Sequence, residues 1–231
     1  MVGFKIEGKK VEGRFVKRLN RFEAIVEIGK NYELCHVPNT GRLKELLVED
    51  AKIYLVKNDK KNRKTKWTLM FVEKKDGLVC INSSMANNVL ECALRDNTIS
   101  LGEGIIKREE NFLKSKFDFF IDGPFKTFIE VKCATFEQNK IAKFPDAPTE
   151  RGKKHIEELI KAVQMGYKAK IVFIAFMDFV NCFEPYKDID EKFAFLLKEA
   201  YKKGVEILAY KCSITLDEVS ISDKIPVNIN C

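Results

Sequence analysis

The spacing of hydrophobic and polar residues changes character near residue 77. Before it, Phe22, Ala24, Val26 and Ile28 alternate with more polar positions, which predicts a half-buried strand that ends at Gly29. Similar segments predict further strands over 32–37, 51–56 and 67–72. Together with one brief helix over 42–47, these strands favour a small β-barrel of the oligonucleotide-binding (OB) type, with a generic β-sandwich as the alternative.

After residue 77 the apolar residues follow a helical period in some segments and a strand pattern in others. Helices are expected over 87–94, 149–165 and 191–202, and strands over 105–112, 116–121, 127–133, 169–176 and 205–210. This order predicts an α/β domain with a mixed central sheet. We therefore expect two domains, an OB-like barrel at 1–80 and a mixed-sheet domain at 81–231.

Charge adds an expectation about the partner. The 231 residues carry 41 Lys and Arg against 34 Asp and Glu, a formal net charge of +7, which favours an anionic partner such as nucleic acid. The basic hairpin loop at 57–66 is suited to following a phosphate backbone, although a solvated charge run is the simpler interpretation.

The seven cysteines are scattered without a CxxC pair, and the N-terminus lacks the apolar run of a secretion signal. The longest apolar stretch, 171–177, is too short to span a bilayer. We expect a protein of the reducing cytoplasm with no membrane partner.

The candidate chemistry lies in the predicted hairpin at 116–133. Asp118 and Glu130 are symmetric about Pro124, so a loop centred there places them directly opposite each other, with β-carbons ~4.5–5.5 Å apart. Glu130 and Lys132 share one strand face because side chains alternate. Two carboxylates at such a distance repel each other unless a cation lies between them.

Oxygen ligands without a neighbouring His or Cys select Mg²⁺ or Mn²⁺ over zinc. Lys132 would lie beside this metal, placed to orient or deprotonate a water and to neutralise charge on a phosphodiester transition state. The hairpin therefore predicts a metal-dependent nuclease-type site, with metal ligands Asp118 and Glu130. The alternative is a surface hairpin with an ordinary cross-strand ion pair.

Asp118 followed by Glu130-Val131-Lys132 resembles the core signature of PD-(D/E)xK nucleases. Two longer motifs, at 36–43 (HVPNTGRL) and 144–155 (FPDAPTERGKKH), resemble hallmarks of the sugar fermentation stimulation protein family. The resemblance spans about 13–210, and it implies an N-terminal OB-like domain, a C-terminal nuclease-like domain and DNA binding, so DNA is favoured over RNA.

Nuclease folds of this type often add an acidic residue from the helix before the hairpin. Glu91 is the first candidate for this catalytic role, and Glu109 or Glu110 is the second. The alternative for Glu91 is a solvated residue near Arg95.

Six further residues are candidates for nucleic-acid binding. Arg151, Lys154 and His155 begin a predicted helix whose free amides favour a phosphate, although a simple capped helix start is the alternative. The remaining candidates are Lys116 before Asp118 and, in the first domain, His36 and Arg42. Barrel aromatics such as Phe22, Tyr32 and Trp67 are suited to base stacking, with core packing as the simpler interpretation for most of them.

Three functions are compatible with these features. The first is a Mg²⁺- or Mn²⁺-dependent enzyme that cleaves nucleic acid phosphodiesters, in which the barrel binds the nucleic acid. The second is a non-catalytic DNA-binding regulator of sugar metabolism that retains a nuclease fold. The third is a sugar- or protein-binding module.

Overall fold

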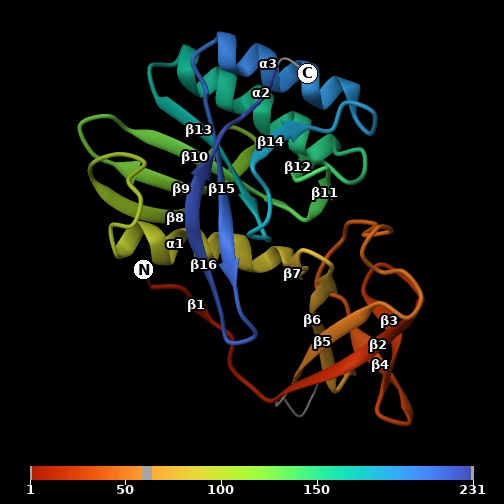
Figure 1. The fold of residues 1–231 in the computed structure, drawn as a ribbon. Helices are drawn as coiled ribbons and strands as arrows, with labels where there is room; N and C mark the ends of the chain where they lie inside the picture. The colour runs from red at the N-terminus through yellow and green to blue at the C-terminus, as the bar shows by residue number, and fades with distance from the viewer. Residues whose placement is uncertain (1, 59–63, 230–231) are drawn as a thin grey trace.

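The structure is a computed structural model that describes residues 2–58 and 64–229. It consists of a small all-β lobe and a larger lobe in which helices cover both faces of a sheet (Figure 1). Five residues of the predicted basic loop, 59–63, lie outside the described residues.

The small lobe is a six-stranded barrel in the order β4-β3-β2-β5-β6-β7, and parallel pairing of β4 with β6 closes it. Its strands are β2 (Lys10–Arg18), β3 (Glu23–Ile28), β4 (Asn31–His36), β5 (Lys52–Lys57), β6 (Trp67–Lys74) and β7 (Gly77–Cys80). The period-two pattern is confirmed for Ala24 and Val26, which are fully buried. Phe22 departs from it, since its side chain is 50% exposed.

The helix predicted over 42–47 is wrong. The chain makes a single turn there, in which the Leu46 and Leu47 amides both donate to the Leu43 carbonyl. Leu43 has a φ of 50°, a left-handed conformation that a regular helix of L residues does not accommodate.

The large lobe is built on a seven-stranded mixed sheet in the order β1-β16-β15-β13-β10-β9-β8. Its strands are β1 (Phe4–Lys5), β8 (Ile105–Phe112), β9 (Ser115–Asp122), β10 (Thr127–Ala134), β13 (Lys168–Ala175), β15 (Glu206–Ile214) and β16 (Glu218–Ile225). β10, β13 and β15 are parallel, and the other pairings are antiparallel. The predicted mixed-sheet domain is therefore confirmed.

Both faces of this sheet are covered by helices. A short 3-10 helix, η1 (Ser83–Met85), leads into α1 (Ala86–Arg95), which packs on one face, and α2 (Glu150–Gln164) and α3 (Glu191–Lys202) lie on the other (Figure 1). Alternate residues of β9 show this division, because Phe119 packs in the α1-side core and Phe117 in the α2-side core. No helix of the described residues is long and apolar enough to cross a membrane.

Three features were not anticipated. Residues 4–5 fall within the barrel domain expected at 1–80, but they form β1, which pairs with β16 in the second sheet and so belongs to the large lobe. β16 itself follows the last expected strand. A small third sheet contains β11 (Phe136–Gln138), β12 (Ile141–Phe144) and β14 (Cys182–Pro185), and β12 leads into the loop before α2.

Candidate active site

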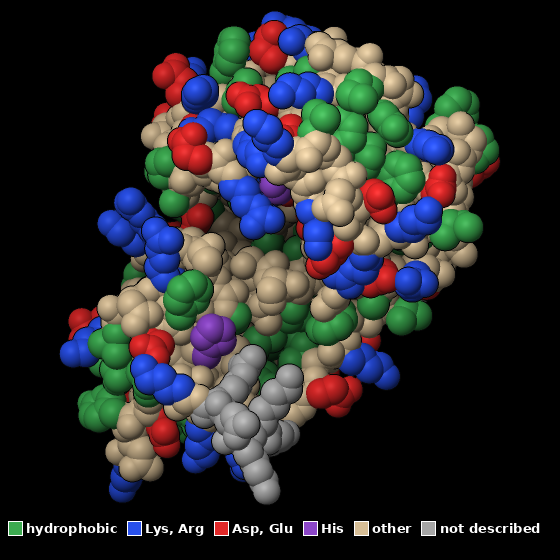
Figure 2. Space-filling view, turned by 180° about the vertical axis from the view of Figure 1, so that it is seen from behind, with side chains coloured by type: hydrophobic (Ala, Val, Ile, Leu, Met, Phe, Trp, Pro, Cys, Tyr) green, Lys and Arg blue, Asp and Glu red, His purple; other side chains and the backbone are tan. Residues whose placement is uncertain are grey.

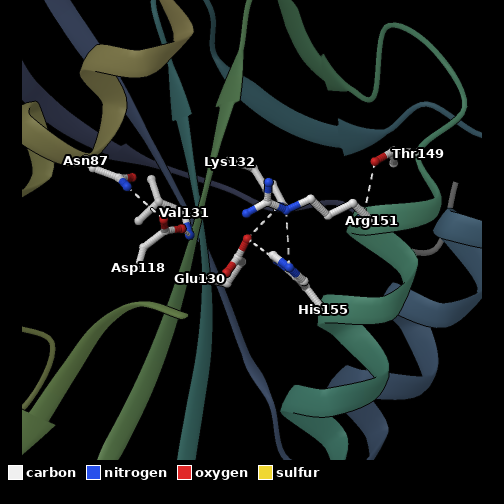
Figure 3. A network of polar contacts seen from close by, with 9 residues as sticks. Asn87, Asp118, Glu130, Val131, Lys132, Thr149, Arg151 and His155 are labelled. Carbon is white, nitrogen blue, oxygen red and sulfur yellow. Dashed lines mark hydrogen bonds and ion pairs between the residues drawn. The ribbon is translucent and has the colours of Figure 1, made fainter. Parts of the chain in front are cut away.

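The antiparallel ladder of β9 and β10 sets the register of the two carboxylates. Ile129 pairs with Phe119, and continuing the ladder by one residue places Glu130 opposite Asp118. At this point the carboxylate replaces the ladder bond, because Asp118 Oδ2 accepts a hydrogen bond from the Val131 amide at 2.8 Å. The structure thus brings together the two residues that the hairpin geometry predicts (Figure 3).

Asp118 is partly buried and is held from two sides. Its Oδ1 accepts a hydrogen bond from the Asn87 side-chain amide of α1 at 2.7 Å, while Oδ2 is held by Val131. Burial raises the pKa of Asp118, and the negative charge of Glu130 raises it further. The Asp118 carboxylate is therefore held close to the negative charge of Glu130.

Glu130 is 3% exposed, and its two carboxylate oxygens have different surroundings. Oε1 lies 2.5 Å from Lys132 Nζ and also contacts His155 Nδ1. Oε2 is buried without a hydrogen-bond partner. Burial alone would raise the pKa of Glu130, but the Lys132 charge and the His155 hydrogen bond outweigh it and lower the pKa.

α2 supplies the third wall of the site. Its N-cap is Thr149, whose hydroxyl accepts a hydrogen bond from the Gly152 amide at 3.0 Å. One turn apart on this helix, Arg151 Nε donates to His155 Nε2 at 3.4 Å (Figure 3). The result is a chain of contacts from Arg151 through His155 to Glu130.

The side chains of Asp118, Glu130, Lys132 and Arg151 line a pocket between the two lobes, and Figure 2 shows the molecule hollowed between the lobes. The barrel contributes Arg21 and the loop at 39–41, and the large lobe contributes the ends of α1 and α2, β10 and the loop at 144–149. Among the described residues, no group of three or more His, Cys, Asp or Glu is arranged to hold a metal ion. The pocket is lined by three acidic residues, Asp118, Glu130 and Asp146, of which Asp118 and Glu130 lie opposite each other. A metal ion held by these two would take its further ligands from water, substrate or other protein groups.

The two motifs at 36–43 and 144–155 meet beside this pocket. Asp146 Oδ2 accepts from the Leu43 amide at 3.4 Å, and a Cβ added to Gly41 would lie 2.2 Å from the same oxygen. Asn39 ties the loop to the chain before α1, since its side-chain amide donates to the Ile81 carbonyl at 2.9 Å. Close packing between the lobes accounts for glycine at position 41.

The acidic residue predicted from the helix is not in the pocket. Glu91 forms ion pairs with Arg95 at 2.7 Å and with Arg108 at 2.8 Å. It lies one helical turn beyond Asn87, or about 6 Å along the axis, so the residue that reaches Asp118 is the amide. The alternatives also fail, because Glu109 is exposed and paired with Lys116, and Glu110 does not line the pocket.

The six predicted nucleic-acid contacts fall in different places. Arg151 lines the pocket and His155 supports Glu130, whereas Lys154 donates to the Lys114 carbonyl and Lys116 pairs with Glu109, both on the surface. His36 and Arg42 line two neighbouring hollows of the barrel.

Sequence reasoning missed Asn87, Arg21 and Asp146 as pocket residues. Asn87 had a signal, since it is a polar residue in the first turn of a helix expected before the hairpin. Arg21 reaches the pocket only because the barrel packs against the large lobe, and nothing in its local sequence indicates this. Asp146 lies within the motif at 144–155, but its contact with the barrel loop has no local signal.

The fold and the pocket define a two-domain protein, an OB-type barrel joined to a mixed-sheet domain that carries a carboxylate–lysine site. The model of the SfsA N-terminal OB domain matches residues 16–81, and that of the sugar fermentation stimulation protein RE domain matches residues 84–218. The chain belongs to the sugar fermentation stimulation protein family.

Individual relatives agree over nearly the whole chain. Sugar fermentation stimulation protein homologs from Caldanaerobacter subterraneus and Clostridium beijerinckii are 42% and 43% identical to it, and the alignments cover 94% of this chain and 96% of each homolog. A structure of Pyrococcus furiosus SfsA in complex with Ca²⁺ has a TM-score of 0.90 and 33% identity, with 99% of both chains covered.

Proposed function

We propose that this protein is a divalent-cation-dependent nuclease whose active site is the pocket around Asp118, Glu130 and Lys132. The observation that carries the proposal is Glu130 Oε2, a buried carboxylate oxygen without a hydrogen-bond partner beside a second carboxylate. An unpaired buried oxygen is costly, and a cation in the pocket would satisfy it. The same cation would relieve the repulsion that raises the pKa of Asp118.

The donor set fits a hard cation. Both ligands are carboxylates, and Mg²⁺ is commonly bound by one or two protein carboxylates together with waters and substrate phosphates. We propose Mg²⁺ or Mn²⁺ as the cofactor, held by Asp118 and Glu130. The Pyrococcus furiosus relative is described in complex with Ca²⁺, another cation that prefers oxygen ligands, which supports a divalent site in this chain.

The surrounding residues have separate roles. When bound, the cation polarises the phosphoryl oxygen and lowers the pKa of the attacking water. Lys132, which ion-pairs with Glu130, is placed to orient that water and to neutralise the developing negative charge. Arg151 is exposed at the pocket and positioned to bind a phosphate. His155 accepts a hydrogen bond from the Arg151 guanidinium and so helps to hold it in place.

Nucleic acid, with DNA favoured over RNA, is the proposed substrate. The net charge of +7 favours a polyanion, and the OB-type barrel is a fold that binds oligonucleotides. The pocket lies between this barrel and the mixed-sheet domain, so a strand held by the barrel would pass the carboxylates. We expect the protein to act in the cytoplasm.

The test is cleavage of a panel of DNA and RNA substrates with Mg²⁺ or Mn²⁺, using the full chain. Asp118→Ala and Lys132→Ala should abolish cleavage, whereas Lys154→Ala, an exposed basic residue outside the pocket, should retain it. Calorimetry with Ca²⁺ should show binding that is lost in Asp118→Ala/Glu130→Ala. Retained cation binding in that double variant would contradict the proposal.

A non-catalytic DNA-binding regulator is favoured by one observation, the amide of Asn87 where related nuclease folds often carry an acid. In that case DNA binding would depend on salt, Asp118→Asn would leave it unchanged, and no member of the substrate panel would be cut.

A further inference from the structure

An aromatic pair lies on the barrel beside the candidate active site. Phe22 precedes β3 and is 50% exposed, although the alternation of β3 would direct it inward. Its ring is nearly parallel to that of His36 at the end of β4, with an interplanar angle of 18° and ring centroids 6.5 Å apart. A large apolar ring left in water next to a second ring is suited to stacking with a flat ligand.

The pair is held in position by the β3–β4 ladder. The Phe22 carbonyl accepts a hydrogen bond from the Val37 amide at 2.8 Å, and His36 Nδ1 lies 3.1 Å from the same oxygen. The backbone that carries Phe22 and the His36 ring are therefore held in place before any ligand arrives, which lowers the entropy cost of binding.

The hollow beside these rings contains a positively charged side chain that is suited to binding an anionic group. Lys64 at its edge is neutralised by Glu23 at 2.7 Å. Arg21 also lines the hollow, and its side chain has no hydrogen bond or ion pair within the described part of the chain. An unpaired guanidinium beside an aromatic platform provides contacts for a phosphate and for the base next to it.

Arg21 connects this hollow to the active site. It lines the aromatic hollow, the pocket of Asp118 and Glu130, and a third hollow that contains Arg18, Arg42 and Lys44. The third hollow has no acidic side chain among its lining residues. These three adjoining hollows form a continuous path for a polyanionic strand. Along it the strand would pass Asp118 and Glu130 and would contact basic side chains of the barrel.

Resting on the proposed nuclease function, we propose that the substrate is an unpaired nucleic acid strand, and that Phe22 and His36 stack one of its bases while Arg21 binds an adjacent phosphate. A base inside a duplex is covered on both faces by its neighbours, so along a strand Phe22 stacks with an unpaired or flipped base and not with an internal paired one. A neutral sugar can also lie on an aromatic ring, but it gives Arg21 no anionic group to bind.

The proposal is tested by fluorescence anisotropy of the full chain with labelled oligo-dT, oligo-U and a blunt DNA duplex. Ca²⁺ replaces Mg²⁺, and all proteins carry Asp118→Asn so that binding is measured without turnover. Phe22→Ala should weaken binding of the unpaired oligomers roughly tenfold, as expected for loss of one stacked base. Phe22→Tyr should restore it, and Arg21→Ala should weaken binding and reduce its salt dependence.

Tyr32→Ala is the matched control. Tyr32 is an exposed aromatic of the same barrel, at 71%, but it does not line the aromatic hollow, so its removal should leave binding unchanged. Comparison of oligo-dT with oligo-U separates a DNA from an RNA strand as the natural ligand.

Equal affinities of Phe22→Ala and its parent for the unpaired oligomers would overturn the proposal, as would tighter, Phe22-dependent binding of the duplex or of a neutral sugar. The two proposals fail separately. Phe22-dependent strand binding without cleavage by the protein with Asp118 intact would remove the nuclease and keep this subsite. Cleavage that is unchanged by Phe22→Ala would keep the nuclease and remove this subsite.

Discussion

Arg151 Nε donates a hydrogen bond to His155 Nε2 at 3.4 Å, and this contact assigns the proton on the imidazole. Because Nε2 accepts from a guanidinium, the ring proton is on Nδ1, from which it is donated to Glu130 Oε1. His155 is thus a positioning residue, which holds one oxygen of the buried Glu130 carboxylate and leaves the second oxygen without a hydrogen-bond partner.

The first prediction concerns this positioning contact. His155→Ala removes a hydrogen-bond donor from a buried carboxylate, so the free energy of unfolding should fall by about 1–3 kcal/mol. Urea denaturation followed by circular dichroism measures this change. Lys154→Ala, next along the helix but exposed, should alter the stability by less than about 0.5 kcal/mol. Equal losses in the two variants would show that the contact with Glu130 contributes nothing.

The second prediction uses the neighbour of Asp118. Asn87→Asp places a third carboxylate beside two others, so the cation-free protein should lose stability through like-charge repulsion. In return its Ca²⁺ affinity should rise, since three carboxylates bind a divalent cation better than two. Asn87→Ala, which removes a partner of the ligand, should lower the affinity about 10-fold.

Calorimetric Ca²⁺ titration of both Asn87 variants measures these effects. Asn88→Asp is the control, because Asn88 contacts Arg108 on the exposed side of α1 and its new charge would pair there. An unchanged Ca²⁺ affinity in Asn87→Asp would contradict the assignment of Asp118 as a cation ligand.

The third prediction follows from the raised pKa of Asp118. Burial and the charge of Glu130 make Asp118 hold its proton to a higher pH than the ordinary value of 3.8. A proton and a cation compete for this carboxylate, so cation affinity should be complete above the raised pKa and should be lost as the pH falls through it. Glu130, with a lowered pKa, should stay ionised over that window.

The sign for stability is opposite in the cation-free protein. The pKa of Asp118 is higher in the folded protein than in the unfolded chain. The fold therefore becomes less stable as the pH rises from the unfolded-state pKa to the folded-state pKa. Ca²⁺ titrations and thermal melts at a series of pH values, with and without the cation, measure both effects. Ca²⁺ affinity that stays constant down to pH values near 3.8 would show that Asp118 is not a ligand.

The sequence predicts well what depends on local periodicity. The symmetry of Asp118 and Glu130 about Pro124 was sufficient to place them opposite each other, because the β9–β10 ladder follows the hairpin without a bulge. The choice of Glu91 failed because an error of one helical turn, from Asn87 to Glu91, moves a side chain from the pocket to Arg108. The positions of the pocket residues were therefore predicted more accurately on the strands than on the helix.

What depends on packing between the lobes was not predictable in this way. The alternation of apolar residues would direct Phe22 into the barrel core, yet it immediately precedes β3 and its side chain is half exposed. Arg21 is an ordinary loop residue until the barrel packs against the large lobe and makes it part of three hollows. Asp146 and Gly41 are more than 100 residues apart, and no local pattern indicates their contact.

The last prediction tests that contact between the lobes. In Gly41→Ala the new Cβ would lie 2.2 Å from Asp146 Oδ2 and 2.8 Å from its Cγ, so the Asp146 side chain or one of the two loops that carry these residues must shift. The free energy of unfolding should fall by about 1–3 kcal/mol, as for other overpacked sites, and unpaired strands should bind more weakly because Arg21 moves relative to the pocket. Thr40→Ala, at an exposed neighbouring position, is the control for stability. If Asp146→Ala, which removes the clashing oxygens, restores both properties to Gly41→Ala, the packing of these two residues sets the geometry between barrel and active site; if it restores neither, the loss has another origin.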